Sequence, residues 1–450
     1  MTVTLHLTVA ENIRRKDAGL EKTGGPKPFV SACRTGHFTE TAIRIGTPQD
    51  SACRISDRAE LVAMNSPPTR SVALARLEAF VPLAAKYAGH RNFDLGVGKH
   101  TGVSCLSPYI RTRLVTEEEA TRAVLARHRP SAAEKFLQEI AWCTYWKGWL
   151  EMRPEAWSHY LATLAEQEKS AAFGNAIAGE TGIECFDHWV RELLDTGYLH
   201  NHARMWFASI WIFTLKLPWQ LGADFFLRHL LDGDPAANTL SWRWVAGLHT
   251  PGKHYLARAE NIAKFTLGRF NPAGQLDEKA QAIPLDQIFT RQALHLPQNP
   301  KPQGRIGHLM FPEDLAMPPE DLGEIHATAA YLPASHQTSS LVTEFLNGAI
   351  SSTLTERSGT RLGESFHSSL NDWISAEKLD SIVISRPTVG FTRDFLTNQT
   401  LPPITHIFIR SWDRLLWPHA TAGFFKLKEA LPKIHASLAP QREGDLFPHL

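Results

Sequence analysis

Apolar residues recur every three or four positions along residues 63–295, starting with the segment PPTRSVALARLEAFVPLAAKYAGH. This spacing places them on one face of a helix, so it predicts helices that bury one side. Glycine and proline interrupt the pattern where helices would begin or end, at Gly148, Gly197, Pro218, Gly222 and Pro235. We therefore expect a mostly α-helical domain over residues 63–295.

The pattern changes after residues 296–304, whose three prolines indicate a linker. Short apolar runs rich in β-branched residues then alternate with helical segments, and these runs are RIGHLMF, EIHATAAYL, LDSIVIS and ITHIFIR. Strands that alternate with helices are typical of a parallel sheet. We expect a C-terminal α/β, Rossmann-like domain over residues 305–450. Residues 1–62 are mixed in character, and we expect a poorly ordered tail or small appendage there.

Composition narrows the possible partners and compartments. The chain has 450 residues and a formal net charge of +1, so a nucleic-acid partner would need a local basic face. The five cysteines form no CxxC pair, which predicts no metal site, and their odd number argues against a complete disulfide framework. We identify no signal peptide and no run of 18 apolar residues. We expect a soluble, monomeric protein of the cytoplasm that does not enter membranes.

The segment at residues 197–244 carries the most specific chemistry. It reads GYLHNHARMWFASIWIFTLKLPWQLGADFFLRHLLDGDPAANTLSWRW, with an Asn and a Met four positions apart, an Arg between them, two Asp two apart, a further Asn and several Trp. This segment resembles the FAD-binding helical domain of the DNA photolyase/cryptochrome family. The resemblance extends over about residues 65–270. It implies that the helical domain binds FAD, and that the partner is DNA containing a pyrimidine dimer.

The order of the two domains departs from the family's pattern. Photolyases also have an α/β domain, but it normally precedes the helical domain, whereas here it would follow. A circular permutation is one interpretation, and an unrelated α/β appendage is the other. We expect residues 305–450 to be dispensable for holding FAD, so that a chain ending near Leu296 would keep the flavin. An antenna chromophore of unknown identity is a possible second cofactor in the α/β domain.

The resemblance assigns flavin contacts to particular residues. These are Tyr87, Val103, Ser104, Cys105, Leu106, Ser107, Asn201, Arg204, Asp232, Asp234 and Asn238. A turn with hydroxyls and unpaired backbone N–H groups at a helix start suits a pyrophosphate. Val103 stands where the family usually has a hydroxyl, and Lys99 is an alternative source of phosphate charge. Arg204 is expected to pair with Asp232, Asp234 to contact the flavin ring or ribityl chain, and Asn238 to lie near flavin N5.

Other positions are assigned to the substrate and to electron transfer. By resemblance these are Glu139, Trp142, Asn201, Met205, Trp219, Trp242 and Trp244. Glu139 would hydrogen-bond a dimer base, while Trp142, Met205 and Trp244 would pack beside the lesion. Trp242 would be the first electron donor and Trp219 the second. Another exit through Trp206 or Trp211 stays open, because the family's outermost Trp has no counterpart near residues 173–179.

Two further observations bear on substrate binding. Cys143 stands where the family usually has an Arg, which removes a fixed positive charge near the flavin and substrate. A local basic rim for DNA would be built from Arg91, His202, Arg204, Arg243, Lys253 and His254. Among these, Arg91, His202 and Arg243 are our candidate DNA-binding residues.

The favoured function is light-driven repair of cyclobutane pyrimidine dimers. The Asn201/Met205 pair looks like the cyclobutane class, since (6-4) repair enzymes have paired histidines where this chain has His200-Asn201. Asn238 favours repair over plant cryptochromes, which have an Asp at that place. The alternative is a cryptochrome-like blue-light photoreceptor without repair activity, and a third reading is a flavin-binding relic without light activity.

Overall fold

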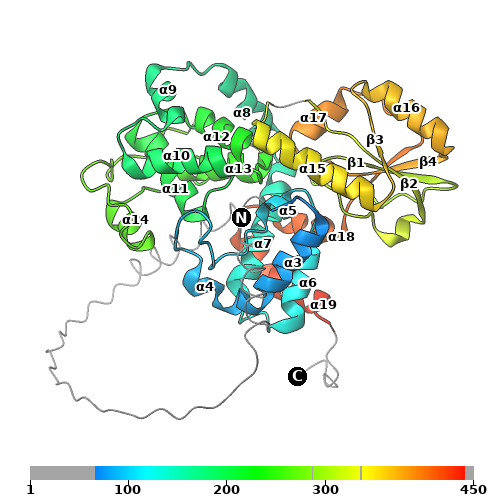
Figure 1. The fold of residues 1–450 in the computed structure, drawn as a ribbon, viewed down its shortest axis with the longest axis horizontal. Helices are drawn as coiled ribbons and strands as arrows, with labels where there is room; N and C mark the ends of the chain where they lie inside the picture. The colour runs from blue at the N-terminus through cyan, green and yellow to red at the C-terminus, as the bar shows by residue number, and fades with distance from the viewer. Residues whose placement is uncertain (1–65, 286, 335–336, 441–450) are drawn as a thin grey trace, which may run out of the picture.

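The computed structural model describes residues 66–285, 287–334 and 337–440, so the predicted tail at residues 1–62 lies outside the described residues. The first part of the chain folds into packed helices (Figure 1). They are α3 (Arg70–Phe80), η2 (Val81–Lys86), α4 (Tyr87–His90), α5 (Ser107–Arg111), α6 (Glu117–Arg127), α7 (Glu134–Glu151), α8 (Glu155–Ala165), α9 (Ala171–Ala178), α10 (Glu184–Thr196), α11 (Asn201–Ser209), η3 (Ile210–Thr214), α12 (Trp219–His229), α13 (Pro235–Val245) and α14 (Ala259–Phe265). In the described chain, no helix combines the length and apolar character needed to cross a membrane.

Local sequence signals explain several helix boundaries. Helix α6 begins with a capping box, in which the Thr116 side chain accepts from the Glu119 amide while Glu119 reaches back to the Thr116 amide. Helix α10 ends at Gly197, whose φ of 65° is the left-handed conformation that glycine adopts without a Cβ penalty. Asp234 caps α13, and Pro235 occupies the first turn, where a missing N–H is harmless. These signals position the residues of segment 197–244.

The second body is a five-stranded, wholly parallel sheet, as the alternating pattern predicted. Its strands are β1 (Ile306–Met310), β2 (Ile325–Ala330), β3 (Thr360–Arg361), β4 (Ser381–Ser385) and β5 (Thr405–Phe408), in the order β3-β2-β1-β4-β5. The intervening helices are η4 (Glu320–Leu322), α15 (Ser340–Glu356), α16 (Phe366–Glu377) and α17 (Phe391–Thr397). The strand order reverses direction between β1 and β4, as in doubly wound sheets. The predicted fold class is therefore confirmed.

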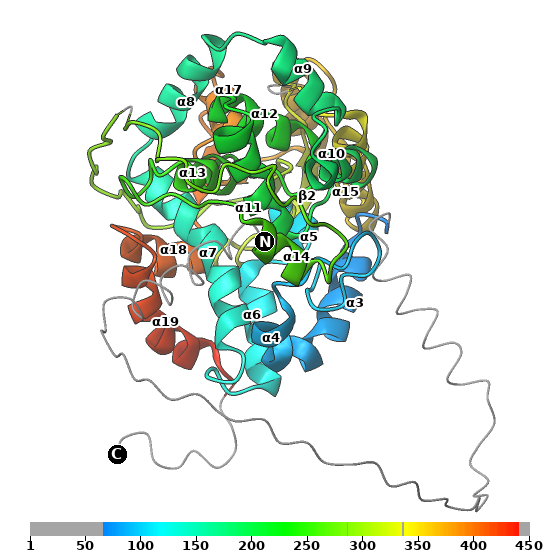
Figure 2. The ribbon, with the colours of Figure 1, turned by 90° about the vertical axis from the view of Figure 1, so that its left-hand side faces the viewer.

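The chain then returns to the helical body, which differs from the predicted boundary at residues 305–450. Helix α18 (Ser411–Leu416), η5 (Trp417–His419) and α19 (Phe425–Leu438) pack on α6 and α7 (Figures 1 and 2). Trp412 Nε1 donates to Thr144 Oγ1 at 2.7 Å. Gly148 allows the close approach, because a Cβ there would lie 2.8 Å from the Trp417 ring. A chain ending near Leu296 would lose this packing from the back of α7.

A buried ion network also joins the two bodies. The Arg113 guanidinium lies between α6 and the sheet, 2.8 Å from Asp314 and 2.7 Å from Asp413. Asp314 additionally pairs with Arg410, and the combined positive charge holds its pKa far below the usual value although burial opposes this. Glu117 lies 3.3 Å from Arg113 on the helical side. Charges from segments 300 residues apart thus meet at one buried point.

Candidate functional site

Arg204 and Asp232 form the best-defined buried ion pair of the site. Arg204 Nη1 and Nη2 each donate to one Asp232 oxygen at 2.9 Å, and Arg204 Nε donates to the Leu199 carbonyl. These two parallel hydrogen bonds hold the guanidinium plane and the carboxylate plane in a fixed relative orientation. Burial alone would raise the pKa of Asp232, but the adjacent Arg204 lowers it below its usual value. The site therefore holds an ionised carboxylate in a fixed orientation.

Tyr198 connects this pair to the predicted pyrophosphate turn. Its ring lies under the Arg204 guanidinium, 5.4 Å from centroid to Cζ, and its hydroxyl contacts Cys105 Sγ at 3.9 Å. Cys105 has a φ of 50°, which turns the chain between Ser104 and the start of α5. Of the other predicted contacts in this region, Val103, Leu106 and Ser107 are buried at the turn, and Tyr87 packs on Phe80 and Phe136. The structure thus brings residues 103–107 beside segment 197–204.

The start of α13 contributes two further predicted residues. Asp234 Oδ1 accepts the Ala237 amide at 2.8 Å, and its Oδ2 lies 3.8 Å from Lys147 Nζ. Asn238 Nδ2 donates to the Ala223 carbonyl at 2.9 Å. Asn238 Oδ1 is buried and has no hydrogen-bond donor among the described residues. An acceptor in this state fits a bound group that carries an N–H, because a buried polar atom without a partner costs free energy.

Glu139 and Trp142 lie one turn apart on α7, both buried. Glu139 Oε2 lies 3.6 Å from Arg91 Nη1, so this arginine faces a carboxylate. The Trp142 ring stacks face to face on Phe424, with centroids 3.6 Å apart and planes 9° apart. No pattern in the sequence pointed to Phe424, which comes from a segment near the C-terminal end of the described residues. On α11, Asn201 and Met205 are also buried and lie one turn apart.

The candidate DNA-binding residues do not form an exposed rim in the structure. Arg91, His202 and Arg243 are all buried. The Arg243 guanidinium lies over the rings of Trp219 and Phe289, at 5.6 and 4.9 Å from their centroids. Burial lowers the pKa of His202 to about 4, so this imidazole is neutral near pH 7. Enclosed cations and a neutral imidazole are poorly placed to reach phosphates at the surface.

The tryptophans assigned to electron transfer have different aromatic neighbours. Trp242 lies 6.2 Å from Trp211 between ring centroids, at an interplanar angle of 85°. Gly222 makes this contact possible, because a Cβ there would lie 2.3 Å from Trp242 and 3.0 Å from Trp211. Trp219 stacks instead on Tyr160 at 5.6 Å, and Trp244 on Tyr255 at 5.9 Å. Trp211, one of the two alternative exits, thus has its ring in contact with that of Trp242.

Comparison with known proteins identifies the helical part of the chain. Residues 136–283 match the family model of the FAD-binding domain of DNA photolyase. This part of the chain is therefore similar to the FAD-binding domain of the photolyase/cryptochrome family. A deoxyribodipyrimidine photo-lyase of Alkalihalophilus pseudofirmus is 31% identical over 201 residues, covering 41% of this chain and 39% of that protein. One of Streptomyces griseus is 37% identical over 150 residues, covering 33% and 32%. The chain thus spans about two fifths or less of these photolyases.

Solved structures with some likeness carry related descriptions. A bacterial class III photolyase from Agrobacterium tumefaciens is 25% identical, with a TM-score of 0.38 over 49% of this chain and 46% of that one. A Synechocystis cryptochrome is 20% identical, with a TM-score of 0.39 over 44% and 43%. The described residues fit the FAD of a photolyase-type domain in two respects. The buried acceptor at Asn238 requires a donor, and the turn at residues 103–107 lies beside the Arg204–Asp232 pair.

Proposed function

We propose that this protein binds FAD and uses light to repair cyclobutane pyrimidine dimers in DNA. The observation that carries the proposal is the convergence of three separate segments on one buried place. The 103–107 turn meets Tyr198, Tyr198 meets Arg204, and Arg204 holds Asp232. Residues 136–283, which contain most of the assigned positions, match the FAD-binding domain of DNA photolyase.

In this proposal some residues contact the cofactor and others contact the substrate. Bound FAD supplies light absorption and one-electron chemistry. Asn238 Oδ1 accepts a hydrogen bond from the flavin edge, and Asp232 with Arg204 fixes charge beside the ring. Glu139 accepts a hydrogen bond from a dimer base, and Arg91 Nη1 lies 3.6 Å from one oxygen of its carboxylate. Trp142 and Met205 pack against the lesion and exclude water from it.

Repair in the cyclobutane class is favoured over the cryptochrome-like alternative by two residue identities. Asn238 is a neutral amide with an open acceptor in the described structure, where plant cryptochromes have an acid. Asn201 and Met205 lie one turn apart on α11, in the pattern of the cyclobutane class. A photoreceptor would share the flavin and the tryptophans but would need neither Glu139 nor Met205.

A light-dependent repair assay tests the proposal. The purified protein is mixed with an oligonucleotide containing cyclobutane dimers, and recovery of absorbance near 260 nm is followed under blue light and in the dark. We expect recovery only in light, and its loss in Glu139→Ala but not in Glu429→Ala, a control at an exposed glutamate. A protein that reduces its FAD in light but repairs nothing would support the photoreceptor. A colourless protein that cannot be reconstituted with FAD would reject both.

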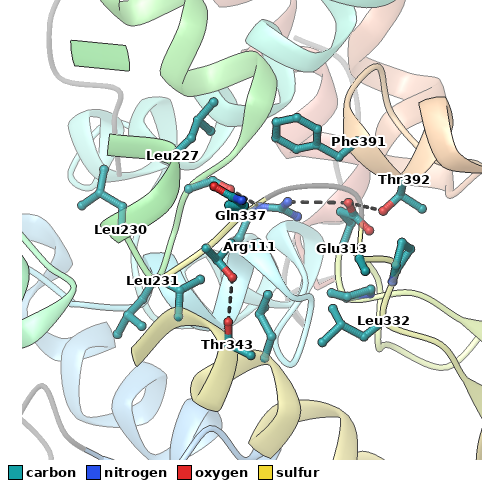
Figure 3. A pocket seen from close by; sticks show the side chains of 17 residues that line it. Arg111, Leu227, Leu230, Leu231, Glu313, Leu332, Gln337, Thr343, Phe391 and Thr392 are labelled. Atoms are coloured by element: carbon teal, nitrogen blue, oxygen red, sulfur yellow. Dashed lines mark hydrogen bonds and ion pairs between the residues drawn. The ribbon is translucent and has the colours of Figure 1, made fainter. Parts of the chain in front are cut away.

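The cavity between the two bodies supports a second proposal, that an antenna chromophore binds there. This cavity of about 430 Å³ lies past the carboxyl ends of β1 and β2. Leu227, Leu332 and Phe391 give it apolar walls, while Glu313 lies between Arg111 and Thr392 (Figure 3). Crevices at the carboxyl ends of strands near a switch point are common ligand sites in doubly wound sheets.

A spectroscopic comparison tests the antenna proposal. Purified protein with a chromophore in this cavity should show an absorption band besides that of FAD, and excitation of the band should drive repair. Leu332→Trp would occupy part of the cavity with a bulky ring and should remove the extra band while leaving FAD in place. An unchanged band in that variant would place the chromophore elsewhere.

A further inference from the structure

Lys147 is a buried cation that none of the assigned roles uses. Its side chain is 7% exposed, and its Nζ lies 3.4 Å from Glu117 Oε1 and 3.8 Å from Asp234 Oδ2. A buried ammonium is costly unless carboxylates surround it. Burial lowers the pKa of Lys147, but Glu117 and Asp234 more than offset this, so the net shift is upward and the side chain stays charged. The structure thus maintains a permanent positive charge beside a predicted flavin contact.

Cys143 lies one turn before Lys147 on α7, on the same side of the helix. Both Lys147 and Asp234 act electrostatically on its thiol, which places the three side chains in one neighbourhood. Burial raises the pKa of Cys143, so this position carries no charge near pH 7. A cation is therefore absent at residue 143 and present four residues later.

Asp234 is held from several sides. One oxygen caps α13 through the Ala237 amide, and the other faces Lys147 and, at 3.9 Å, Arg111. Arg111 additionally donates to the Gly233 carbonyl at 2.9 Å. Glu117 Oε1 also lies within 3.4 Å of the Lys147 ammonium. The orientation of Asp234 thus depends on a lysine that is itself anchored.

We propose that Lys147 is a positioning residue for FAD, which sets the Asp234 carboxylate and supplies from position 147 the positive charge that Cys143 lacks. The inference rests on the proposed function, because it takes Asp234 as a contact of the flavin or its ribityl chain. Lys147 acts through Asp234 and touches neither substrate nor reacting atoms. This role explains how the chain retains Asp232 and Asp234 beside the proposed flavin site although residue 143 is a cysteine and not an arginine.

The test compares FAD affinity across a small set of variants of the full chain. Apoprotein is titrated with FAD, and flavin fluorescence gives the dissociation constant. Lys147→Met removes the charge at similar length and should weaken FAD binding about tenfold or more. Lys147→Arg should stay near wild type, and Lys426→Met, at an exposed lysine, is the matched control. The double variant Cys143→Arg/Lys147→Met should regain most of the lost affinity.

Two further measurements separate positioning from general support of the fold. Thermal unfolding of each apoprotein reports stability independently of FAD. A cycle with Asp234→Asn asks whether the losses from Lys147→Met and Asp234→Asn overlap, as they must if one residue acts through the other.

Different results of these measurements support or overturn the role of Lys147. FAD affinity unchanged in Lys147→Met, or additive losses in the cycle, would overturn the inference, even if the variant melts earlier. A restored affinity in Cys143→Arg/Lys147→Met would support it, and overlapping losses in the cycle support it where that double variant does not fold. A wild-type chain that takes up no FAD would contradict the proposed function itself, and this result is distinct from wild type and Lys147→Met binding FAD equally.

Discussion

Phe424 lies flat against Trp142, although 282 positions separate them in the chain. Tyr145 contacts the same phenylalanine edge-on at 5.6 Å, and its hydroxyl donates to the Ala422 carbonyl at 2.7 Å. The segment before α19 therefore fixes one face of the tryptophan assigned to the lesion. A fixed ring loses little conformational entropy when a base stacks on it.

Removing this ring should weaken substrate binding without removing the flavin. We expect Phe424→Leu to raise the dissociation constant for dimer-containing DNA about three- to tenfold, because the aromatic stack contributes about 0.5–1.5 kcal/mol beyond burial. Filter binding or fluorescence anisotropy measures this, and flavin absorbance checks the cofactor. Phe366→Leu, in the separate core of the sheet, is the control for a lost buried ring. Equal DNA affinity in wild type and Phe424→Leu would show that Trp142 needs no such support.

The contact between Trp242 and Trp211 predicts the route of photoreduction. Trp242→Phe should block reduction of FAD by light and an external thiol, while chemically reduced protein still repairs. Trp211→Phe should slow photoreduction more than Trp219→Phe does, since Trp211 is the ring 6.2 Å away. Flavin absorbance under steady blue light gives the rates. The reverse order for the two second-step variants would restore Trp219 as the second donor.

The buried network at Arg113 predicts a large loss of stability when its cation is removed. Arg113→Met leaves Glu117, Asp314 and Asp413 without their shared partner, which should lower the free energy of unfolding by about 3–5 kcal/mol. Urea unfolding followed by circular dichroism measures it. Arg122→Met removes a half-exposed i,i+4 partner of Glu118 and should cost less than about 1 kcal/mol. Similar stability of both variants would mean that the network adds nothing beyond surface pairs.

His308 predicts a loss of stability toward acid. Burial in β1 lowers its pKa to about 3, so the unfolded chain, with a pKa near 6.5, binds the proton first as pH falls. Stability is therefore full above pH 6.5 and decreases below it, by about 2 kcal/mol between pH 6.5 and 5 from this residue. In His308→Leu that part of the decline should vanish, whereas His367→Gln, at an exposed histidine, should leave it unchanged. Denaturant unfolding at several pH values measures this decline. If the free energy of unfolding falls with pH equally steeply in wild type and His308→Leu, the result would argue against a neutral buried imidazole.

The sequence predicted what local spacing controls. Helical periodicity, the glycine at position 197 and the Asp234–Pro235 start of α13 are signals within a few residues, and the structure has these elements. The alternation of apolar runs likewise predicted the parallel sheet. Arg204 and Asp232 are 28 positions apart, yet family resemblance alone, not spacing, suggested that they pair.

The sequence contains no comparable local signal for contacts between distant segments. The spacing of apolar residues in a helix shows that one face is buried but not against which partner, so the packing of α18 on α7 and of α19 on α6 was not predicted. Arg91 and Arg243 are charged in sequence, and only three-dimensional packing encloses them among Glu139 and aromatic rings. The sequence pattern predicted a helix boundary at Gly222. In the structure this residue lies within α12 and leaves room for the indole rings of Trp242 and Trp211.

The return of the chain at Ser411 makes the sheet an insertion with two covalent attachments to the helical body, one at residues 296–304 and one before α18. A domain held by a single linker can swing or be released by one protease cut. Here a cut at residues 296–304 would leave the two bodies joined through residue 411, and a second cut would be needed to part them. The cavity lined by Arg111 therefore lies between two bodies that the chain connects twice.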